Sequence, residues 1–210
     1  MTIQVEHINS KGTGVIKLLR YPENDLSNVQ PAIFSPEEFV KYTSFKSVKR
    51  KSEFYHVRVL WQSFGIDEPI QYDKLGRPFL AKGFISISHS RDLILIAFDA
   101  DHPVGIDVEY YSPKIREIQH KFISTEDRTL INPEADRDLT IVWSIKEAVY
   151  KMERMEGLSF KDHMHVSIEG DHAKVEVIKG SARHRYDFSY IDRGDHIITF
   201  CSHADLNEPS

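Results

Sequence analysis

The sequence has very little cysteine: Cys201 is the only one among 210 residues, so no disulfide bond can form within the chain. It lies in the apolar run Ile197-Ile198-Thr199-Phe200-Cys201, which predicts a buried structural thiol. The sequence also lacks an apolar stretch long enough to span a membrane, and its N-terminus lacks a signal-peptide pattern. We therefore expect a cytoplasmic protein in a reducing compartment, with no membrane partner.

An excess of positive charge is missing too. The formal net charge is −5 at pH 7, which argues against a general nucleic-acid-binding protein, although basic residues cluster locally. Low-complexity segments and internal repeats are absent. With 40% hydrophobic and 28% charged residues, the chain can form one large domain or two small ones.

Strand and helix patterns alternate along the chain. Ser35-Pro36-Glu37-Glu38 predicts a helix start, with serine as N-cap, proline at the first position and acids in the first turn. A second helix is expected over 47–64, ending at Gly65. The other expected elements are strands near 3–8, 13–19, 84–88, 92–99 and 103–109, helical regions near 113–130 and 136–155, and strands near 164–169, 173–179, 184–191 and 195–202.

This mixture predicts an α/β (α+β) protein whose two halves have similar strand and helix content. The polar segment Asp99-Ala100-Asp101-His102 lies between two expected strands and is the best boundary. The expected halves are therefore 1–101 and 102–210.

Two carboxylates, Asp107 and Glu109, form the most informative feature of the sequence. Side chains alternate along a strand, so the two acids share one face while Ile106 and Val108 point into a core. Two carboxylates on one face repel each other unless a cation lies between them, and their oxygens suit a hard ion such as Mg²⁺. The alternative is a solvated acidic edge that binds nothing.

A third carboxylate, Glu147, lies on an expected helix in the segment Trp143-Ser144-Ile145-Lys146-Glu147-Ala148-Val149-Tyr150-Lys151. An apolar stripe on this helix consists of Leu139, Val142, Ile145, Val149 and Met152. Glu147 and Lys151 lie on the adjoining face, and their four-residue spacing allows them to pair. The helix is either an exposed one with an internal ion pair or the wall of a site, with an acid for a metal and a cation for a phosphate.

Together these two segments resemble the paired signature of the 4′-phosphopantetheinyl transferase superfamily, of the Sfp type. Three upstream features agree in order. Leu75-Gly76-Arg77-Pro78 resembles the family's Gly-Lys/Arg-Pro turn, Ile85-Ser86-Ile87-Ser88-His89-Ser90 resembles its Ser-His-Ser strand, and Lys49-Arg50-Lys51-Ser52-Glu53 with Arg58 resembles its basic N-terminal helix. The resemblance runs from about residue 40 to about residue 160.

The resemblance implies two pseudo-symmetric α/β halves with the active site between them. It also implies transfer of the 4′-phosphopantetheine group from coenzyme A to a serine of an apo acyl or peptidyl carrier protein, with adenosine 3′,5′-bisphosphate as by-product. Asp107, Glu109 and Glu147 would hold Mg²⁺, and Glu147 would also take the serine proton. Lys151 would hold a pyrophosphate oxygen and stabilise the leaving group. We expect a monomer without a nucleic-acid partner.

The same resemblance implies the residues that contact coenzyme A. His89 and Ser88 would contact phosphate oxygens, although an isolated histidine after a strand is more often a surface or core residue. Arg77 would lie near the adenine or a phosphate, whereas an ordinary turn residue is the alternative. Arg50 and Arg58 rank first for the 3′-phosphate because residues eight apart return to nearly the same helix face, with Lys46 and Lys49 as the next choices.

Some features depart from this pattern. Arg154 occupies a position where the family commonly has glycine. We therefore expect the loop after this helix to differ from the loop typical of the family. His163 and His165 share one face of an expected strand, but they lack further ligands for a transition metal.

Two other functional classes use similar residues. A metal-dependent phosphohydrolase would use the same acids with water as acceptor, and a non-catalytic protein could bind coenzyme A or a carrier protein without transfer. The order of the Ser-His-Ser and Gly-Arg-Pro segments disfavours the hydrolase. Retention of all three acids and Lys151 disfavours the binding protein.

Overall fold

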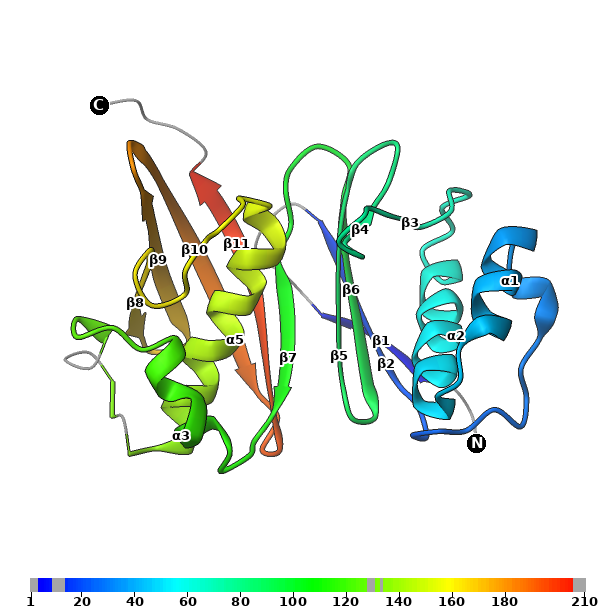
Figure 1. The fold of residues 1–210 in the computed structure, drawn as a ribbon, viewed down its shortest axis with the longest axis horizontal. Coiled ribbons are helices and arrows are strands. Elements are labelled where there is room, and N and C mark those ends of the chain that lie inside the picture. The colour runs from blue at the N-terminus through cyan, green and yellow to red at the C-terminus, as the bar shows by residue number, and fades with distance from the viewer. Residues whose placement is uncertain (1–3, 9–13, 128–130, 133, 206–210) are drawn as a thin grey trace.

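The computed structural model of the chain describes residues 4–8, 14–127, 131–132 and 134–205 (Figure 1). Its strands form two main antiparallel sheets and one small strand pair. The first sheet has the order β1 (Gln4–Ile8), β2 (Val15–Arg20), β6 (Leu93–Asp99), β5 (Phe84–Ser90). The second has the order β7 (Ile106–Tyr110), β11 (His196–Asp205), β10 (Ala182–Asp192), β9 (His172–Lys179), β8 (Met164–Glu169). The small pair is β3 (Gln71–Tyr72) with β4 (Pro78–Phe79).

Helices flank both sheets, and the sequence explains where the longer ones begin. Helix α1 (Pro36–Ser44) starts with a complete capping box, in which Ser35 and Glu38 each bond the other's backbone N–H. Helix α2 (Val48–Gln62) begins at Ser47, whose side chain accepts from the Arg50 N–H. The remaining helical segments are η1 (Pro31–Ile33), α3 (Ile115–Ile118), η2 (Gln119–Lys121) and α5 (Asp136–Glu153).

The elements stack as layers, with α2 on the outer face of the first sheet and α5 on the outer face of the second (Figure 1). Ile94 and Ile96 of β6 pack toward Leu60 of α2. The alternate residues of the same strand face the second sheet, where Leu95 joins a cluster with Val108. Strands β5 and β7 therefore meet at the junction of the two sheets.

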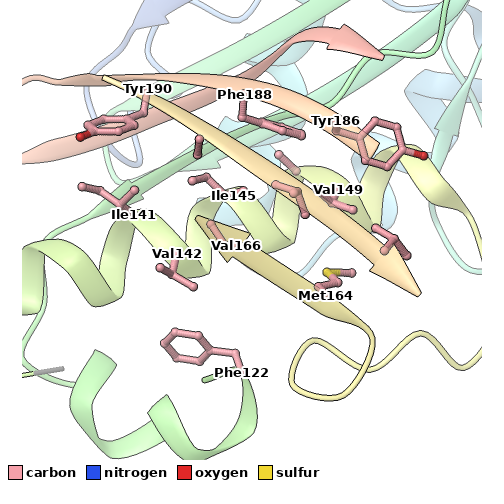
Figure 2. Close-up of a cluster of buried hydrophobic side chains, with 14 of the residues drawn as sticks. Phe122, Ile141, Val142, Ile145, Val149, Met164, Val166, Tyr186, Phe188 and Tyr190 are labelled. Atoms are coloured by element: carbon pink, nitrogen blue, oxygen red, sulfur yellow. The ribbon is translucent and has the colours of Figure 1, made fainter. Parts of the chain in front are cut away.

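The largest apolar cluster lies between α5 and the second sheet (Figure 2). Ile145 and Val149 of α5 are fully buried there against Val166 and Phe188. Full burial of each such side chain contributes about 1.5–3 kcal/mol. This packing is the predicted apolar stripe of the 136–155 helix, and it presents the adjoining helix face to β7.

The structure differs from the sequence-based expectation at two places. The expected helical region 113–130 is interrupted after η2, where Ser124 and Asp127 bond each other's backbone N–H groups. Residues 128–130 lie outside the described ranges. The pair β3–β4 was not expected, since each of its strands has only two residues and therefore little periodicity.

The expected boundary Asp99–His102 is a turn between β6 and β7. The Asp99 carboxylate accepts from the backbone N–H groups of Asp101 and His102. The division into halves at this turn stays a prediction, since the two sheets share an apolar interface. Within the described ranges, no helix combines the length and the apolarity needed to cross a membrane.

Candidate active site

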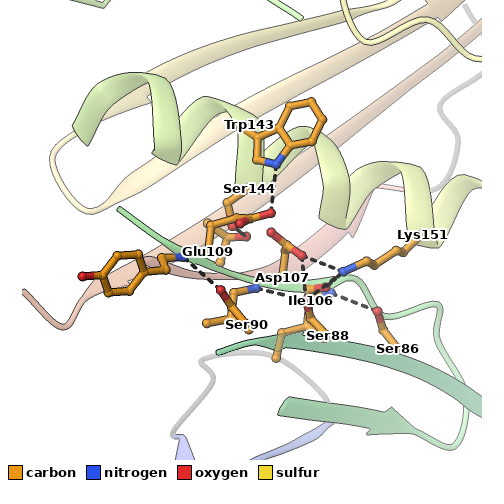
Figure 3. A network of polar contacts seen from close by, with 12 residues as sticks. Ser86, Ser88, Ser90, Ile106, Asp107, Glu109, Trp143, Ser144 and Lys151 are labelled. Atoms are coloured by element: carbon orange, nitrogen blue, oxygen red, sulfur yellow. Dashed lines mark hydrogen bonds and ion pairs between the residues drawn. The ribbon is translucent and has the colours of Figure 1, made fainter. Parts of the chain in front are cut away.

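Two of the three acids predicted from the sequence, Asp107 and Glu109, lie on β7 (Figure 3), and the third, Glu147, belongs to α5. Ile106 and Val108 are buried toward the first sheet, so Asp107 and Glu109 face α5, as strand alternation predicts. The helix approaches β7 closely because residue 105 is glycine: a Cβ there would lie 2.6 Å from the carbonyl oxygen of Ala148.

A row of three serines on β5 supports β7 from the other sheet (Figure 3). Ser86, Ser88 and Ser90 accept from the backbone N–H groups of Ile106, Val108 and Tyr110, at 3.2, 3.2 and 3.1 Å. On its other side β7 pairs with β11, so this edge has no neighbouring strand in its sheet. The serine hydroxyls thus satisfy buried amides that would otherwise be costly.

Ser88 also joins Asp107 and Lys151 into one contact. Its hydroxyl donates to Asp107 Oδ1 at 2.7 Å and accepts from Lys151 Nζ at 3.0 Å. Lys151 Nζ lies 2.6 Å from the same Asp107 oxygen and 3.3 Å from the Ile106 carbonyl oxygen. Among the described ion pairs, Lys151 therefore pairs with Asp107 of the neighbouring strand β7, rather than with Glu147 along its helix as the spacing had suggested.

The other two acids are strongly affected by their surroundings. Burial raises the pKa of Glu109 to about 7, and the negative charge of Asp107 adds to the rise. The Trp143 indole N–H opposes that rise by donating to Glu109 Oε1 at 2.9 Å. Burial and Asp107 likewise raise the pKa of Glu147 to about 7, against the opposing charge of Lys151. The site thus has three carboxylates and one cation that influences all of them.

The donor set fits a hard cation. Among the described residues, no three acidic, histidine or cysteine side chains already converge as a metal cluster. However, the second oxygen of Asp107, Oδ2, is buried without a hydrogen-bond partner, which is costly for a carboxylate. Three carboxylates with an unsatisfied inward oxygen are the ligands expected for a divalent cation that takes oxygen ligands.

A second feature is a cavity of about 240 Å³ lined by α1, α2, β5 and the segment 72–78. Three of the predicted coenzyme A contacts line it, namely Arg50, Arg58 and His89. Sequence reasoning missed two further charged residues of its wall, Lys41 and Glu53. The cavity thus brings four basic residues together with one acid.

Arg58 is not placed as expected for a phosphate ligand. Its guanidinium lies 2.9 Å from Glu38, donates to the Tyr72 hydroxyl at 3.0 Å and stacks on Phe54 at 3.7 Å from the ring centroid. Only 5% of the Arg58 side chain is exposed. Arg58 therefore holds the cavity wall together, whereas Arg50 is exposed and stays free of a carboxylate among the described ion pairs.

Two other predicted contacts also lie elsewhere than expected. Arg77 bonds Asp73 at 2.8 Å within its own turn, as an ordinary turn residue does. Ser88 is 5% exposed and points to the opposite side of β5 from His89, because the two are consecutive strand residues. Its single hydroxyl proton is given to Asp107 rather than left for a phosphate.

Lys146 is the buried group that sequence reasoning overlooked. Its Nζ donates to Asp127 at 2.6 Å and to the carbonyl oxygens of Phe122 and Phe160 at 2.7 and 2.9 Å. A signal was present, since residue 146 lies four after Val142 and three before Val149, inside the apolar stripe. A lysine at such a position requires a buried partner.

The residues that departed from the family pattern each have a partner within the protein. Arg154 adopts a left-handed conformation with φ 51° at the end of α5, the geometry for which glycine is usual, and its guanidinium bonds the Pro78 carbonyl oxygen at 2.8 Å. His163 precedes β8 and accepts from the Ser159 N–H, whereas His165 pairs with Glu126. The two histidines therefore have separate partners.

Comparison of the sequence with known proteins points to one family. A sequence model described as the 4′-phosphopantetheinyl transferase superfamily matches residues 103–201, which include both acidic segments. The protein 4′-phosphopantetheinyl transferase Sfp of Bacillus subtilis (strain 168) is 31% identical over 144 residues, covering 66% of this chain and 63% of that protein. A 4′-phosphopantetheinyl transferase of Bacillus subtilis is 37% identical over 120 residues, covering 51% of each chain. The matched segments thus span between about half and just under two thirds of these relatives.

Proposed function

Since this chain belongs to the 4′-phosphopantetheinyl transferase superfamily, we propose that it transfers the 4′-phosphopantetheine group of coenzyme A to a serine of an apo acyl or peptidyl carrier protein. The observation that supports this most is the adjacency of two complementary sites. The first site lies between β7 and α5 and consists of Asp107, Glu109, Glu147 and Lys151. The second is the basic cavity, whose His89 is close enough to the first site for the charge of Lys151 to lower the pKa of its ring.

The reaction follows from this arrangement. The carrier serine Oγ attacks the phosphorus that bears the pantetheine arm, and the bond from that phosphorus to the bridging pyrophosphate oxygen breaks. Adenosine 3′,5′-bisphosphate leaves with the bond's electron pair, and the serine proton passes to a carboxylate. Glu147 is our choice of acceptor, because α5 brings this carboxylate to the site together with Lys151, and a positioned carboxylate can act as a general base.

The other residues of the site would bind the metal ion and the negatively charged pyrophosphate. Family members are generally metal-dependent, and we propose Mg²⁺ on Asp107, Glu109 and Glu147; when bound, it neutralises charge on the pyrophosphate oxygens. Lys151 would then turn from Asp107 to a pyrophosphate oxygen and stabilise the leaving group. Ser88 would keep one hydrogen bond on Asp107 throughout.

The basic cavity would take the adenosine end of coenzyme A. We propose that Arg50 and Lys41 hold the 3′-phosphate, that His89 reaches the pyrophosphate, and that Arg58 supports Tyr72 in the wall. The first half of the chain would then bind the nucleotide and the second half would supply the carboxylates. This division assigns binding to residues 1–101 and chemistry mainly to 102–210.

The test is mass spectrometry of an apo carrier protein after incubation with coenzyme A, Mg²⁺ and this protein. We expect a gain of the phosphopantetheine mass on the carrier serine, and none without the protein. Cleavage of coenzyme A without carrier modification would instead indicate a phosphohydrolase. Binding of coenzyme A with neither product would indicate a non-catalytic binding protein.

A further inference from the structure

The basic cavity contains a carboxylate that a phosphate-binding wall does not need. Glu53 lies on α2, and only 14% of its side chain is exposed. Because like charges repel, a carboxylate here weakens the binding of any anionic ligand unless it has another role. The contacts of Glu53 identify that role.

Glu53 contacts the one imidazole of the cavity. Its Oε1 lies 3.5 Å from His89 Nδ1 and 3.8 Å from Lys49 Nζ, and the second of these contacts is within one helix. His89 comes from β5, so the first contact joins helix to sheet across the cavity floor. A carboxylate that accepts from one ring nitrogen fixes the orientation of the imidazole and leaves the other nitrogen for a ligand.

The charged groups around His89 differ in their effect. Partial burial has the largest effect and lowers the pKa of His89. The positive charges of Lys49 and Arg50 on α2 and of Lys151 on α5 lower it further. Glu53 is the group that opposes them and favours the protonated ring. Loss of Glu53 should therefore lower the pKa of His89 further and disfavour the protonated ring, which has an N–H on both nitrogens.

We propose that Glu53 is a positioning residue for coenzyme A binding: its carboxylate, 3.5 Å from His89 Nδ1, orients the ring so that Nε2 faces a phosphate oxygen of the ligand. The inference rests on the proposed function, since it takes coenzyme A as the ligand. It adds that the only acid of the cavity works through the histidine and not by touching the ligand.

The first test needs no ligand. The imidazole signals of the 11 histidines are followed by NMR against pH in the full-length protein, and His89 is assigned with His89→Gln. The pKa of His89 should fall in Glu53→Gln and stay at the wild-type value in Asp67→Asn, which removes an exposed acid outside the cavity. An unchanged pKa in Glu53→Gln overturns the inference.

The second test measures coenzyme A affinity by calorimetry at two pH values chosen from the NMR titrations of wild type and Glu53→Gln. At a pH between the two His89 pKa values, Glu53→Gln should weaken binding by about tenfold, the order of one charge-assisted hydrogen bond. At a pH below both values the ring is protonated in both proteins, so the loss should shrink or reverse because the repulsive carboxylate is gone. A purely structural role predicts the same loss at both pH values, which would contradict the inference.

A double variant shows whether Glu53 acts through His89. In the His89→Gln background, Glu53→Gln should cause no further loss of affinity at the pH where the single variant shows its loss, whereas Glu53→Asp in the wild-type background should retain part of the affinity. Additive losses overturn the positioning role. If wild-type protein binds no coenzyme A, both the inference and the proposed function fail. If wild-type protein binds coenzyme A and transfers its arm, but the pKa of His89 is the same in wild type and Glu53→Gln, the inference alone fails.

Discussion

The hydroxyl of Ser88 donates to Asp107 Oδ1 at 2.7 Å, although the two residues belong to different sheets. The same oxygen of Ser88 accepts from the Val108 N–H and from Lys151, so it is fully used in the junction of the two sheets. The Ser-His-Ser segment therefore has two functions on its two faces. Its serines support the carboxylate site, and its histidine lines the basic cavity.

Replacing Ser88 by alanine should lower both stability and transfer. The change leaves the buried Val108 N–H unsatisfied and releases Asp107, which should cost about 1–3 kcal/mol in the free energy of unfolding. Ser86→Ala is the matched control, because it removes the same kind of bond to Ile106 but touches no carboxylate. Urea unfolding should give similar losses for both variants, while the turnover number should fall only in Ser88→Ala. Equal turnover in the two would exclude a role of Ser88 at the site.

Glu147→Gln should lower the turnover number by about 10²–10⁴-fold, because positioned proton transfer contributes on this order. The Michaelis constant for coenzyme A should change little, since the nucleotide cavity is untouched. Steady-state kinetics with an apo carrier protein check both values, and the exposed Glu156→Gln provides the control. A loss below tenfold would rule out Glu147 as an essential ligand or base.

The two arginines of α2 should behave differently toward the 3′-phosphate. Arg50→Ala should reduce the preference for coenzyme A over 3′-dephospho-coenzyme A, because Arg50 is an exposed cation of the cavity wall. Arg58→Ala should instead destabilise the fold by about 3–5 kcal/mol, because it leaves Glu38 without its buried partner. Calorimetric titration with both ligands, together with urea unfolding, separates these effects. A preference that survives Arg50→Ala unchanged would assign the 3′-phosphate to other cations, of which Lys41 is the nearest choice.

Lys146→Met should destabilise the protein by about 3–5 kcal/mol, because it leaves the buried Asp127 carboxylate unpaired. Lys161→Met removes an exposed lysine and should change the unfolding free energy by less than about 0.5 kcal/mol. Urea denaturation of both variants measures the difference. Equal midpoints would mean that the Lys146–Asp127 pair contributes nothing to folding.

Stability should also depend on pH through His56. This imidazole is 4% exposed, stacks on Tyr21 and contacts the Ser52 carbonyl oxygen, and burial lowers its pKa although the nearby Asp25 opposes that effect. The unfolded chain, with a histidine pKa of about 6.5, therefore binds a proton more readily than the folded one. Stability should be complete above about pH 6.5 and fall as the pH decreases below it.

His56→Phe should flatten this dependence, because it keeps an aromatic ring beside Tyr21 but removes the titrating group. His120→Gln, at an exposed position, should leave the pH dependence unchanged. Thermal denaturation between pH 5 and pH 8 provides the comparison. An identical pH profile in wild type and His56→Phe would assign the acid sensitivity to other groups.

Much of the site was predictable because its residues obey local periodicities. Strand alternation placed Asp107 and Glu109 on one face, and the helical period placed Glu147 and Lys151 beside the apolar stripe. The contacts across the sheet junction were not predictable in this way. Lys151 meets an acid 44 positions away rather than the one four positions away, and no periodicity along one element encodes that choice.

The same limit applies to the arginines of α2. Their spacing of eight residues predicted that both lie on nearly the same helix face, and both line one cavity. It could not show that Glu38 of another helix, held by its own capping box, would occupy Arg58. Competition between a ligand and an internal partner depends on tertiary contacts, which a single helix does not reveal.

The serine row also suggests a way to use this fold as a tool. Asp101 and His102 are exposed in the turn between the two sheets, so a cut between them would leave the nucleotide cavity on one fragment and the three carboxylates on the other. Each fragment would expose half of the apolar interface between the two sheets. The first fragment would also expose the serine hydroxyls of β5, and the second would expose the backbone N–H groups of β7 that donate to them. The two fragments would thus be complementary to each other, and under the proposed function carrier labelling would report when two fusion partners bring them together.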